Sequence, residues 1–173
     1  PSLATGGEIK NTFCLAQGRH AFMSQHIGDM ENFDTQESFR RSVSHMQKLF
    51  RIRPELIACD LHPGYHSSRL ATEIAESSSG ARLVKVQHHH AHIAALMAEH
   101  GLSGQQPVFG FCFDGTGYGT DGTIWGGEFL LSNGAEFRRA AHLAPFRLPA
   151  GEQAIQDVWK TGYSLLYLSL IHI

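Results

Sequence analysis

The chain has 173 residues, of which 42% are hydrophobic and 17% are charged, and its 14 basic residues nearly balance 16 acidic ones. This composition indicates a globular protein with a sizeable core, and the balanced charge excludes a basic surface of the kind that recruits nucleic acid. No stretch reaches the roughly 18 consecutive apolar residues of a membrane-spanning helix. The three cysteines have no paired spacing, so we expect core thiols in a cytoplasmic protein without membrane or nucleic-acid partners.

Two β-rich runs open the chain. Residues 7–16 and 20–27 flank a turn at residues 17–19, which predicts an antiparallel hairpin.

A polar group lies inside the first run. Lys10, Asn11 and Thr12 follow two glycines, and their ammonium, amide and hydroxyl groups suit contact with a phosphate. A solvated strand edge has the same composition, and this segment alone favours that interpretation.

An amphipathic helix is predicted next. Asp34 is the expected N-cap, with Glu37 completing a capping box, and Pro54 ends the element. One face of the helix carries the apolar residues Phe39, Val43, Met46 and Phe50. The run 56–59 that follows is typical of a strand covered on both faces.

A polar loop, residues 60–66, follows this strand at its carboxyl end, where ligands bind in open α/β sheets. Asp60 and His62 are therefore candidates for a binding site. A cap of the next helix by Asp60 fits the sequence equally well.

Strands and helices then alternate. We predict a helix over 67–77 with Leu70, Ala71 and Ile74 inward, and a strand over 83–86. The next helix begins at His88, buries Ile93, Leu96 and Met97, and stops at His100-Gly101. The remaining predicted elements are a buried strand over 108–113, a hairpin of 123–131 and 136–143 across Asn133-Gly134, and a last helix from Glu152.

Four histidines, at positions 88, 89, 90 and 92, mark the start of the third helix. Because a helix repeats every ~3.6 residues, His88 and His92 lie one turn apart on one face and can bind one ion. Asp114, at the end of the next strand, supplies a third ligand if it meets this turn. Two imidazoles and a carboxylate suit iron or zinc and leave positions open for water or substrate.

The histidines have two other interpretations. A thermolysin-like peptidase needs a glutamate directly after the first histidine, and His89 stands there instead. The remaining alternative is a polar helix start whose rings form local hydrogen bonds.

A glycine-rich loop follows Asp114. Residues 117–122 match the dinucleotide pattern by letter, but a strand-like segment rather than a helix comes next. A strand–loop–strand unit can still hold phosphate with its backbone N–H groups, helped by the hydroxyls of Thr116, Thr120 and Thr123. The alternative is an ordinary tight connection.

These motifs resemble a known family. Val86-Gln-His-His-His-Ala-His92, with Phe113-Asp-Gly-Thr-Gly-Tyr-Gly-Thr-Asp-Gly-Thr-Ile-Trp-Gly-Gly-Glu-Phe129, is similar to the Kae1-like domain of HypF-type carbamoyltransferases, maturation factors of nickel–iron hydrogenases. Gly6-Gly-Glu-Ile-Lys-Asn-Thr-Phe-Cys14, Ser24-Gln-His-Ile-Gly-Asp29 and Cys59-Asp-Leu-His-Pro63 also resemble that family. The resemblance extends to about Tyr167.

The resemblance implies an α/β fold, the ribonuclease-H-like lobe of the actin-like ATPase (ASKHA) fold, with helices packed on a mixed sheet. Residues 1–167 are then the first lobe of a Kae1-like domain, with a second lobe or interlobe helix starting at about 151. Residues 168–173 are expected to be a truncated or non-native tail. Since the chain starts at Pro1 and stops inside a helical run, we expect a piece of a longer enzyme that is inactive alone.

The implied activity is carbamoyl transfer from carbamoyl-adenylate, made from carbamoyl phosphate and ATP, to the C-terminal cysteine of a HypE-type partner. The thiocarbamate later becomes a cyanide ligand of the hydrogenase. By resemblance, a divalent metal, iron or zinc, is bound by His88, His92 and Asp114 and polarises the carbamoyl-adenylate for attack. The implied nucleotide-phosphate contacts are Lys10, Asn11, Thr12, Gly115, Thr116, Gly117, Gly119 and Gly122. The alternative is a metal-stabilised nucleotide-binding or recognition module without catalysis of its own.

Overall fold

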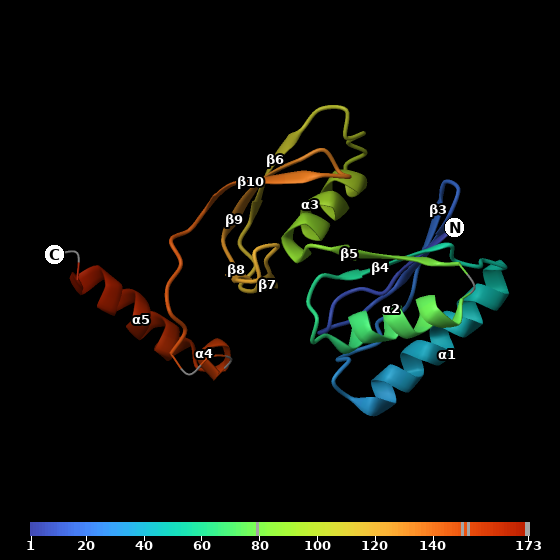
Figure 1. The fold of residues 1–173 in the computed structure, drawn as a ribbon, viewed down its shortest axis with the longest axis horizontal. Helices are drawn as coiled ribbons and strands as arrows, with labels where there is room; N and C mark the ends of the chain where they lie inside the picture. Colours follow the sequence, from blue (N-terminus) through green and yellow to red (C-terminus); the bar gives the residue numbers. More distant parts are fainter. Residues whose placement is uncertain (79, 150, 152, 172–173) are drawn as a thin grey trace. The chain divides into compact units, whose positions relative to one another are not determined.

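The computed structural model describes residues 1–78, 80–149, 151 and 153–171, and the chain divides into two units, Pro1–Ala141 and His142–Ile173 (Figure 1). The first unit contains a five-stranded sheet of order β3-β2-β1-β4-β5. Its strands are β1 (Ser2–Ala4), β2 (Cys14–Gln17), β3 (His20–Met23), β4 (Leu56–Asp60) and β5 (Arg82–Val86). Strands β1, β4 and β5 are parallel, whereas β2 and β3 form the antiparallel edge.

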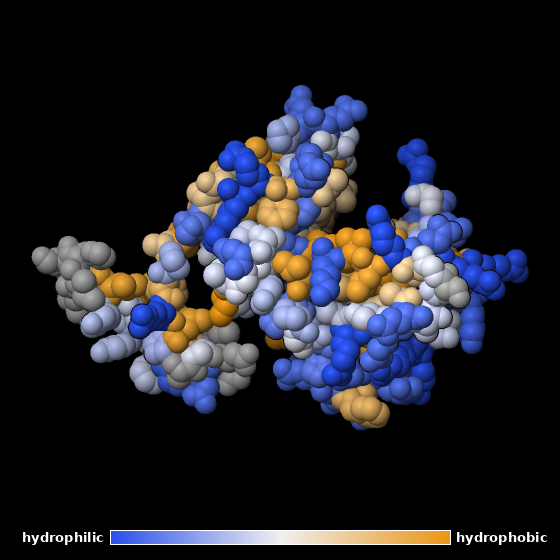
Figure 2. Space-filling model, viewed as in Figure 1, coloured by the Kyte–Doolittle hydropathy of each residue, from blue (hydrophilic) through white to orange (hydrophobic). Residues whose placement is uncertain are grey.

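Two helices cover one face of this sheet, as Figure 1 shows: α1 (Phe33–Phe50) and α2 (His66–Ser77). The predicted apolar faces are buried here. Phe39 meets the ring of Phe13 edge-on at 5.4 Å, and Phe50 stacks on Phe22 at 4.0 Å. Leu70 of α2 is fully buried in the same core. The outer side of both helices is hydrophilic (Figure 2).

The start of α1 differs from the prediction, which placed the N-cap at Asp34. Asn32 is the cap, and its side chain accepts hydrogen bonds from the amides of Asp34 and Thr35. Asn and Asp are both good caps, so only the extended backbone at Asn32 decides between two residues this close in sequence.

The first predicted strand is too long. The hairpin forms, but its first strand begins at Cys14 rather than at residue 7. The side-chain amide of Asn11 donates to the carbonyls of Thr5 and Gly7, and Gly6 and Lys10 have positive φ, so residues 5–11 fold as a loop.

A second sheet, of order β10-β9-β6, packs on α3 (His88–Glu99). Its strands are β6 (Val108–Cys112), β9 (Glu128–Ser132) and β10 (Phe137–His142), and a short ribbon of β7 (Gly117–Tyr118) and β8 (Ile124–Trp125) lies within the loop between β6 and β9. Ile93 and Met97 form the buried side of α3. A Cβ at Gly110 would overlap the Ile93 side chain, so this glycine lets helix and sheet approach.

Two burial predictions in this region are wrong. Leu96 is 55% exposed because α3 contacts the sheet through its Ile93 and Met97 face only. The strand over 108–113 is buried on one face, and Phe109, Phe111 and Phe113 lie exposed on the other. The sequence of this strand is continuously apolar, but its side chains alternate between a buried and an exposed face.

The second unit contains α4 (Gln153–Gln156) and α5 (Val158–Ile171), where a helix was predicted from Glu152, a residue outside the described ranges. Within it, the Ser164 hydroxyl donates to the Arg147 carbonyl at 2.6 Å. None of the helices in the described ranges has the length and apolar character needed to cross a bilayer. The three cysteines are free thiols, as predicted.

Candidate metal centre and phosphate loop

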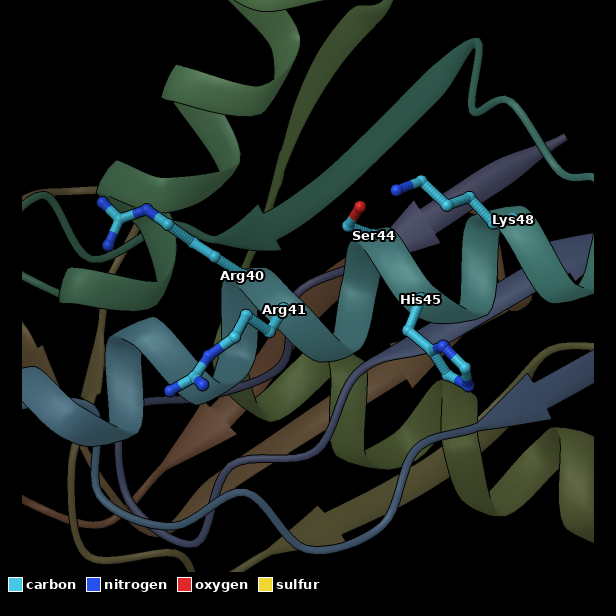
Figure 3. Close-up of a pocket in the computed structure, with 5 residues that line it drawn as sticks. All are labelled: Arg40, Arg41, Ser44, His45 and Lys48. Atoms are coloured by element: carbon cyan, nitrogen blue, oxygen red, sulfur yellow. The ribbon is translucent and has the colours of Figure 1, made fainter.

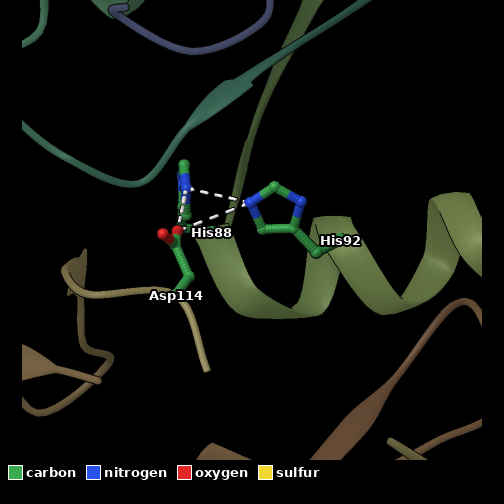
Figure 4. Close-up of side chains that lie close together, drawn as sticks. All are labelled: His88, His92 and Asp114. Atoms are coloured by element: carbon green, nitrogen blue, oxygen red, sulfur yellow. Dashed lines mark hydrogen bonds and ion pairs between the residues drawn. The ribbon is translucent and has the colours of Figure 1, made fainter. Parts of the chain in front are cut away.

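Three side chains meet at the first turn of α3 (Figure 4). His88 and His92 extend from the helix, and Asp114 reaches them from the segment after β6. The Nε2 atoms of the two histidines are 3.2 Å apart, and Oδ2 of Asp114 lies 2.8 Å from His88 Nε2 and 3.5 Å from His92 Nε2. The structure therefore brings together the three residues predicted to share an ion.

These separations fit a bound ion. Nitrogen and oxygen ligands lie about 2.0–2.2 Å from zinc, which places the ligand atoms of a tetrahedral site about 3.3 Å apart. The three measured separations, 3.2, 2.8 and 3.5 Å, lie around that value. Two imidazole nitrogens and a carboxylate oxygen are a donor set that both iron and zinc accept.

Asp60 orients the first of these ligands. Its Oδ2 lies 2.7 Å from Nδ1 of His88, and its Oδ1 accepts from the His62 amide at 2.8 Å. The side chain of Asp60 is buried, and its hydrogen bond raises the pKa of the His88 imidazole, while desolvation opposes that rise. A proton held on Nδ1 by Asp60 leaves Nε2 free to bind a cation.

Of the two roles left open for Asp60, the structure supports the one in the site. The N-cap of α2 is Tyr65, which makes no side-chain capping bond, and Asp60 bonds to His62 and His88 instead. His62 lies beside them, stacked on Tyr65 at 4.1 Å and edge-on to Tyr118 at 5.4 Å.

Gln87, which sequence reasoning missed, caps α3 and ties it to the glycine loop. Its Oε1 accepts from the His90 amide, and its Nε2 lies 3.0 Å from Nδ1 of His89 and 3.4 Å from the Tyr118 carbonyl. Burial lowers the pKa of the His89 imidazole. The signal in sequence is weak, because glutamine is an uncommon cap.

The glycine loop lies directly against the histidines. A Cβ at Gly117 would lie 2.6 Å from Cε1 of His89 and 3.1 Å from Cβ of His88. One at Gly126 would lie 2.6 Å from the Gly115 carbonyl, so the two ends of the loop touch.

The loop also presents unused donors. Within the described part of the chain, the amides of Thr116 and Thr120 find no acceptor. Such free N–H groups beside a cation site are what an anionic phosphate requires.

The predicted phosphate contacts near the N-terminus lie in the loop that follows strand β1. Lys10 is exposed, Asn11 is buried with its amide turned toward Thr5 and Gly7, and Thr12 is half-buried. Lys10 is thus the accessible cation of this group. Phosphate contact by the three residues stays a prediction.

Glu8, which the sequence did not single out, connects this loop to α2. It accepts from the Ser67 amide and lies 2.6 Å from Nδ1 of His66. Burial raises the pKa of the neighbouring Tyr65 phenol, and the charges of Asp60, Glu8 and Asp114 add to that rise.

A different hollow lies on the exposed side of α1, lined by Arg40, Arg41, Ser44, His45 and Lys48 (Figure 3). Figure 3 shows that these side chains point in different directions rather than toward one point. Arg40 is paired with Glu73 at 2.8 Å. We interpret this surface as a solvated helix face.

Relatives are known for almost the whole chain. Residues 1–99 match the family model of the HypF Kae1-like domain, and residues 110–172 match the carbamoyltransferase Kae1-like domain, second subdomain. The chain is 47% identical over 165 residues to carbamoyltransferase HypF2 of Cupriavidus necator and 42% identical over 164 residues to carbamoyltransferase HypF of Rhizobium leguminosarum bv. viciae. Each match covers 95% of this chain but 20% and 21% of the relatives, so the chain spans about a fifth of their length.

Solved structures share the fold. One is a crystal structure of full-length HypF in the phosphate- and nucleotide-bound form, with a TM-score of 0.86 and 42% sequence identity. The match covers 98% of this chain and 22% of the HypF chain. Another is the crystal structure of T. kodakarensis HypF, with a TM-score of 0.80 and 40% sequence identity. That match covers 88% of this chain and 20% of the T. kodakarensis chain. The predicted α/β class, a ribonuclease-H-like lobe with helices packed on a mixed sheet, is confirmed by these neighbours.

Proposed function

The chain belongs to the family of the HypF Kae1-like domain, and on that premise we propose that it forms the metal- and phosphate-binding lobe of a carbamoyltransferase. The proposed reaction transfers a carbamoyl group from carbamoyl-adenylate, formed from carbamoyl phosphate and ATP, to the C-terminal cysteine of a HypE-type partner. Its place is the maturation of nickel–iron hydrogenases, in the cytoplasm. Residues 1–167 are proposed as the first lobe, with an interlobe helix or second lobe from about 151.

The observation that carries this proposal is the meeting of His88, His92 and Asp114 from two elements, at separations that suit one ion. A divalent ion held there supplies Lewis-acid polarisation of a carbonyl or phosphoryl oxygen. His92 and Asp114 keep 57% and 39% of their side-chain surface exposed. An open cluster suits catalysis, because structural zinc sites are closed by four protein ligands.

The chain's own residues have distinct roles in this proposal. Asp60 holds the proton of His88 on Nδ1, so that Nε2 stays a ligand. The free amides of Thr116 and Thr120 receive phosphate oxygens of the adenylate, and Lys10 offers a further positive charge. The carbamoyl carbon is then placed beside the metal site, open to the approaching thiolate.

The test uses the full-length gene product, purified with iron or zinc supplied. His88→Ala and His92→Ala are each expected to lower the metal content per chain and to abolish carbamoylation of the partner cysteine, as measured by elemental analysis and mass spectrometry. The matched control is His45→Ala, which removes an exposed histidine of α1. Metal content and carbamoylation that stay at the unsubstituted level in both site variants would refute the proposal. Loss of metal with carbamoylation intact would favour the non-catalytic module.

A further inference from the structure

An ion pair between a buried carboxylate and a partly buried guanidinium contacts the end of the glycine loop. Nε and Nη2 of Arg139 donate to the two carboxylate oxygens of Glu128 at 2.6 and 2.8 Å. Glu128 is fully buried in β9, and Arg139 comes from the neighbouring strand β10. Two parallel hydrogen bonds of this kind fix the guanidinium plane as well as its position.

Both partners of this pair reach into the loop. Glu128 Oε1 also accepts from the Gly126 amide at 3.1 Å, at the end of the loop. The guanidinium carbon of Arg139 lies 4.1 Å from the centre of the Trp125 ring, which is stacking distance for a cation over indole.

Asp121, at the tip of the loop, contacts both Trp125 and Arg139. Trp125 Nε1 donates to Asp121 Oδ1 at 2.9 Å, and the same oxygen accepts from the amide and hydroxyl of Thr123. The other oxygen of Asp121 lies 3.7 Å from Nη1 of Arg139. Arg139, Trp125 and Asp121 therefore each contact the other two.

The loop needs such support because its composition opposes order. Glycine is frequent between positions 115 and 127, and glycine loses more conformational entropy on ordering than any other residue. A loop already held in its binding conformation does not lose this entropy when the ligand arrives. A buried ion pair is by itself weak evidence for stability, so its connection to the loop is the informative feature.

We propose that Arg139, with Glu128, Trp125 and Asp121, forms a brace that holds the glycine loop in its phosphate-binding conformation. Arg139 is then a positioning residue for the phosphates of a nucleotide. This inference rests on the proposed function, since it assumes that the loop receives phosphate. Lysine cannot replace Arg139, because an ammonium cannot bond two carboxylate oxygens in one plane and also stack flat on indole.

The experiment measures ATP–magnesium affinity of the full-length gene product by calorimetry, with Arg139→Lys as the test variant. Arg138→Lys is the matched control, because Arg138 is exposed and is the adjacent residue of the same strand. We expect Arg139→Lys to raise the Kd for ATP by about tenfold or more, and Arg138→Lys to leave it unchanged within about twofold. Hydrogen exchange of the amides between 115 and 126 is expected to accelerate in Arg139→Lys, with α3 still protected.

A second variant distinguishes loss of the brace from misfolding caused by loss of the Arg139–Glu128 pair. Asp121→Asn alters only the exposed end of the brace and is expected to weaken ATP binding in the same direction. Metal affinity of the His88, His92 and Asp114 cluster stays unchanged in both variants, which a general loss of structure would not allow. If the unsubstituted protein binds ATP and both variants bind it equally well, the brace is refuted and the proposed function is not. A parent that binds no ATP overturns the nucleotide role in the proposed function as well.

Discussion

Asp60 favours the tautomer of His88 that carries its proton on Nδ1. One of its oxygens is engaged by the His62 amide, and the other lies against Nδ1 of His88. In Asp60→Asn, the amide oxygen keeps the His62 bond, so the NH₂ group faces Nδ1 and donates to it. The proton of His88 then moves to Nε2, the atom that faces Asp114 and His92.

We therefore expect Asp60→Asn to weaken zinc or iron binding about 10- to 100-fold, the usual effect of losing a carboxylate behind a metal-bound histidine. Competition titration with a chromogenic chelator measures this change. Asp34→Asn, which alters an exposed carboxylate of α1, serves as the control. An affinity equal to that of the control would show that Asp60 does not orient His88.

At the scale of the element, the glycine loop depends on close approach to α3. Gly117 has no room for a methyl group, because a Cβ there would meet the buried ring of His89 at 2.6 Å. We expect Gly117→Ala to reduce the free energy of unfolding by about 1–3 kcal/mol through overpacking. To make room for the methyl group, the loop must move away from α3. Asp114 then moves away from the histidines, so metal affinity is expected to fall as well.

Urea unfolding and metal titration check this prediction. Gly7→Ala is the matched glycine control, because a Cβ there meets nothing within 4 Å. Equal unfolding midpoints for the two alanine variants would contradict a tight contact between the loop and α3.

At the scale of the whole molecule, the sheet of β6, β9 and β10 packs on α3 with one face only. Phe109, Phe111 and Phe113 lie exposed on the other face, and Phe129 contacts all three. Three exposed rings on neighbouring alternate positions form an apolar patch of the kind that binds hydrophobic dyes.

Substitutions on the two faces of this sheet are expected to differ. Phe111 is 61% exposed, so Phe111→Thr changes the free energy of unfolding by less than about 1 kcal/mol and lowers the fluorescence of a bound naphthalene-sulfonate dye. Leu130 is fully buried against α3, and Leu130→Ala is expected to cost about 2–5 kcal/mol. Urea titration and dye fluorescence of the 173-residue chain measure both, and unchanged fluorescence in Phe111→Thr would argue that the dye binds elsewhere.

Local sequence patterns predicted much of the fold. Apolar spacing located α1, α2 and α3, and the histidine spacing of one helical turn put His88 and His92 on one face. The position of Asp60 at the end of a buried run marked it as a candidate. A period of two would also have indicated a buried Glu128, because it shares a strand face with Leu130.

Which side chains share a helix turn or a strand face follows from the amino-acid sequence, because those relations depend on backbone geometry within one element. Tertiary structure alone decided that Asp114 meets the histidines, that Asp60 supports His88 and that Arg139 reaches Trp125. It also decided that Phe111 is exposed while Leu130 is buried. These relations join residues far apart in the chain, so they depend on how whole elements pack, which local periodicity does not encode.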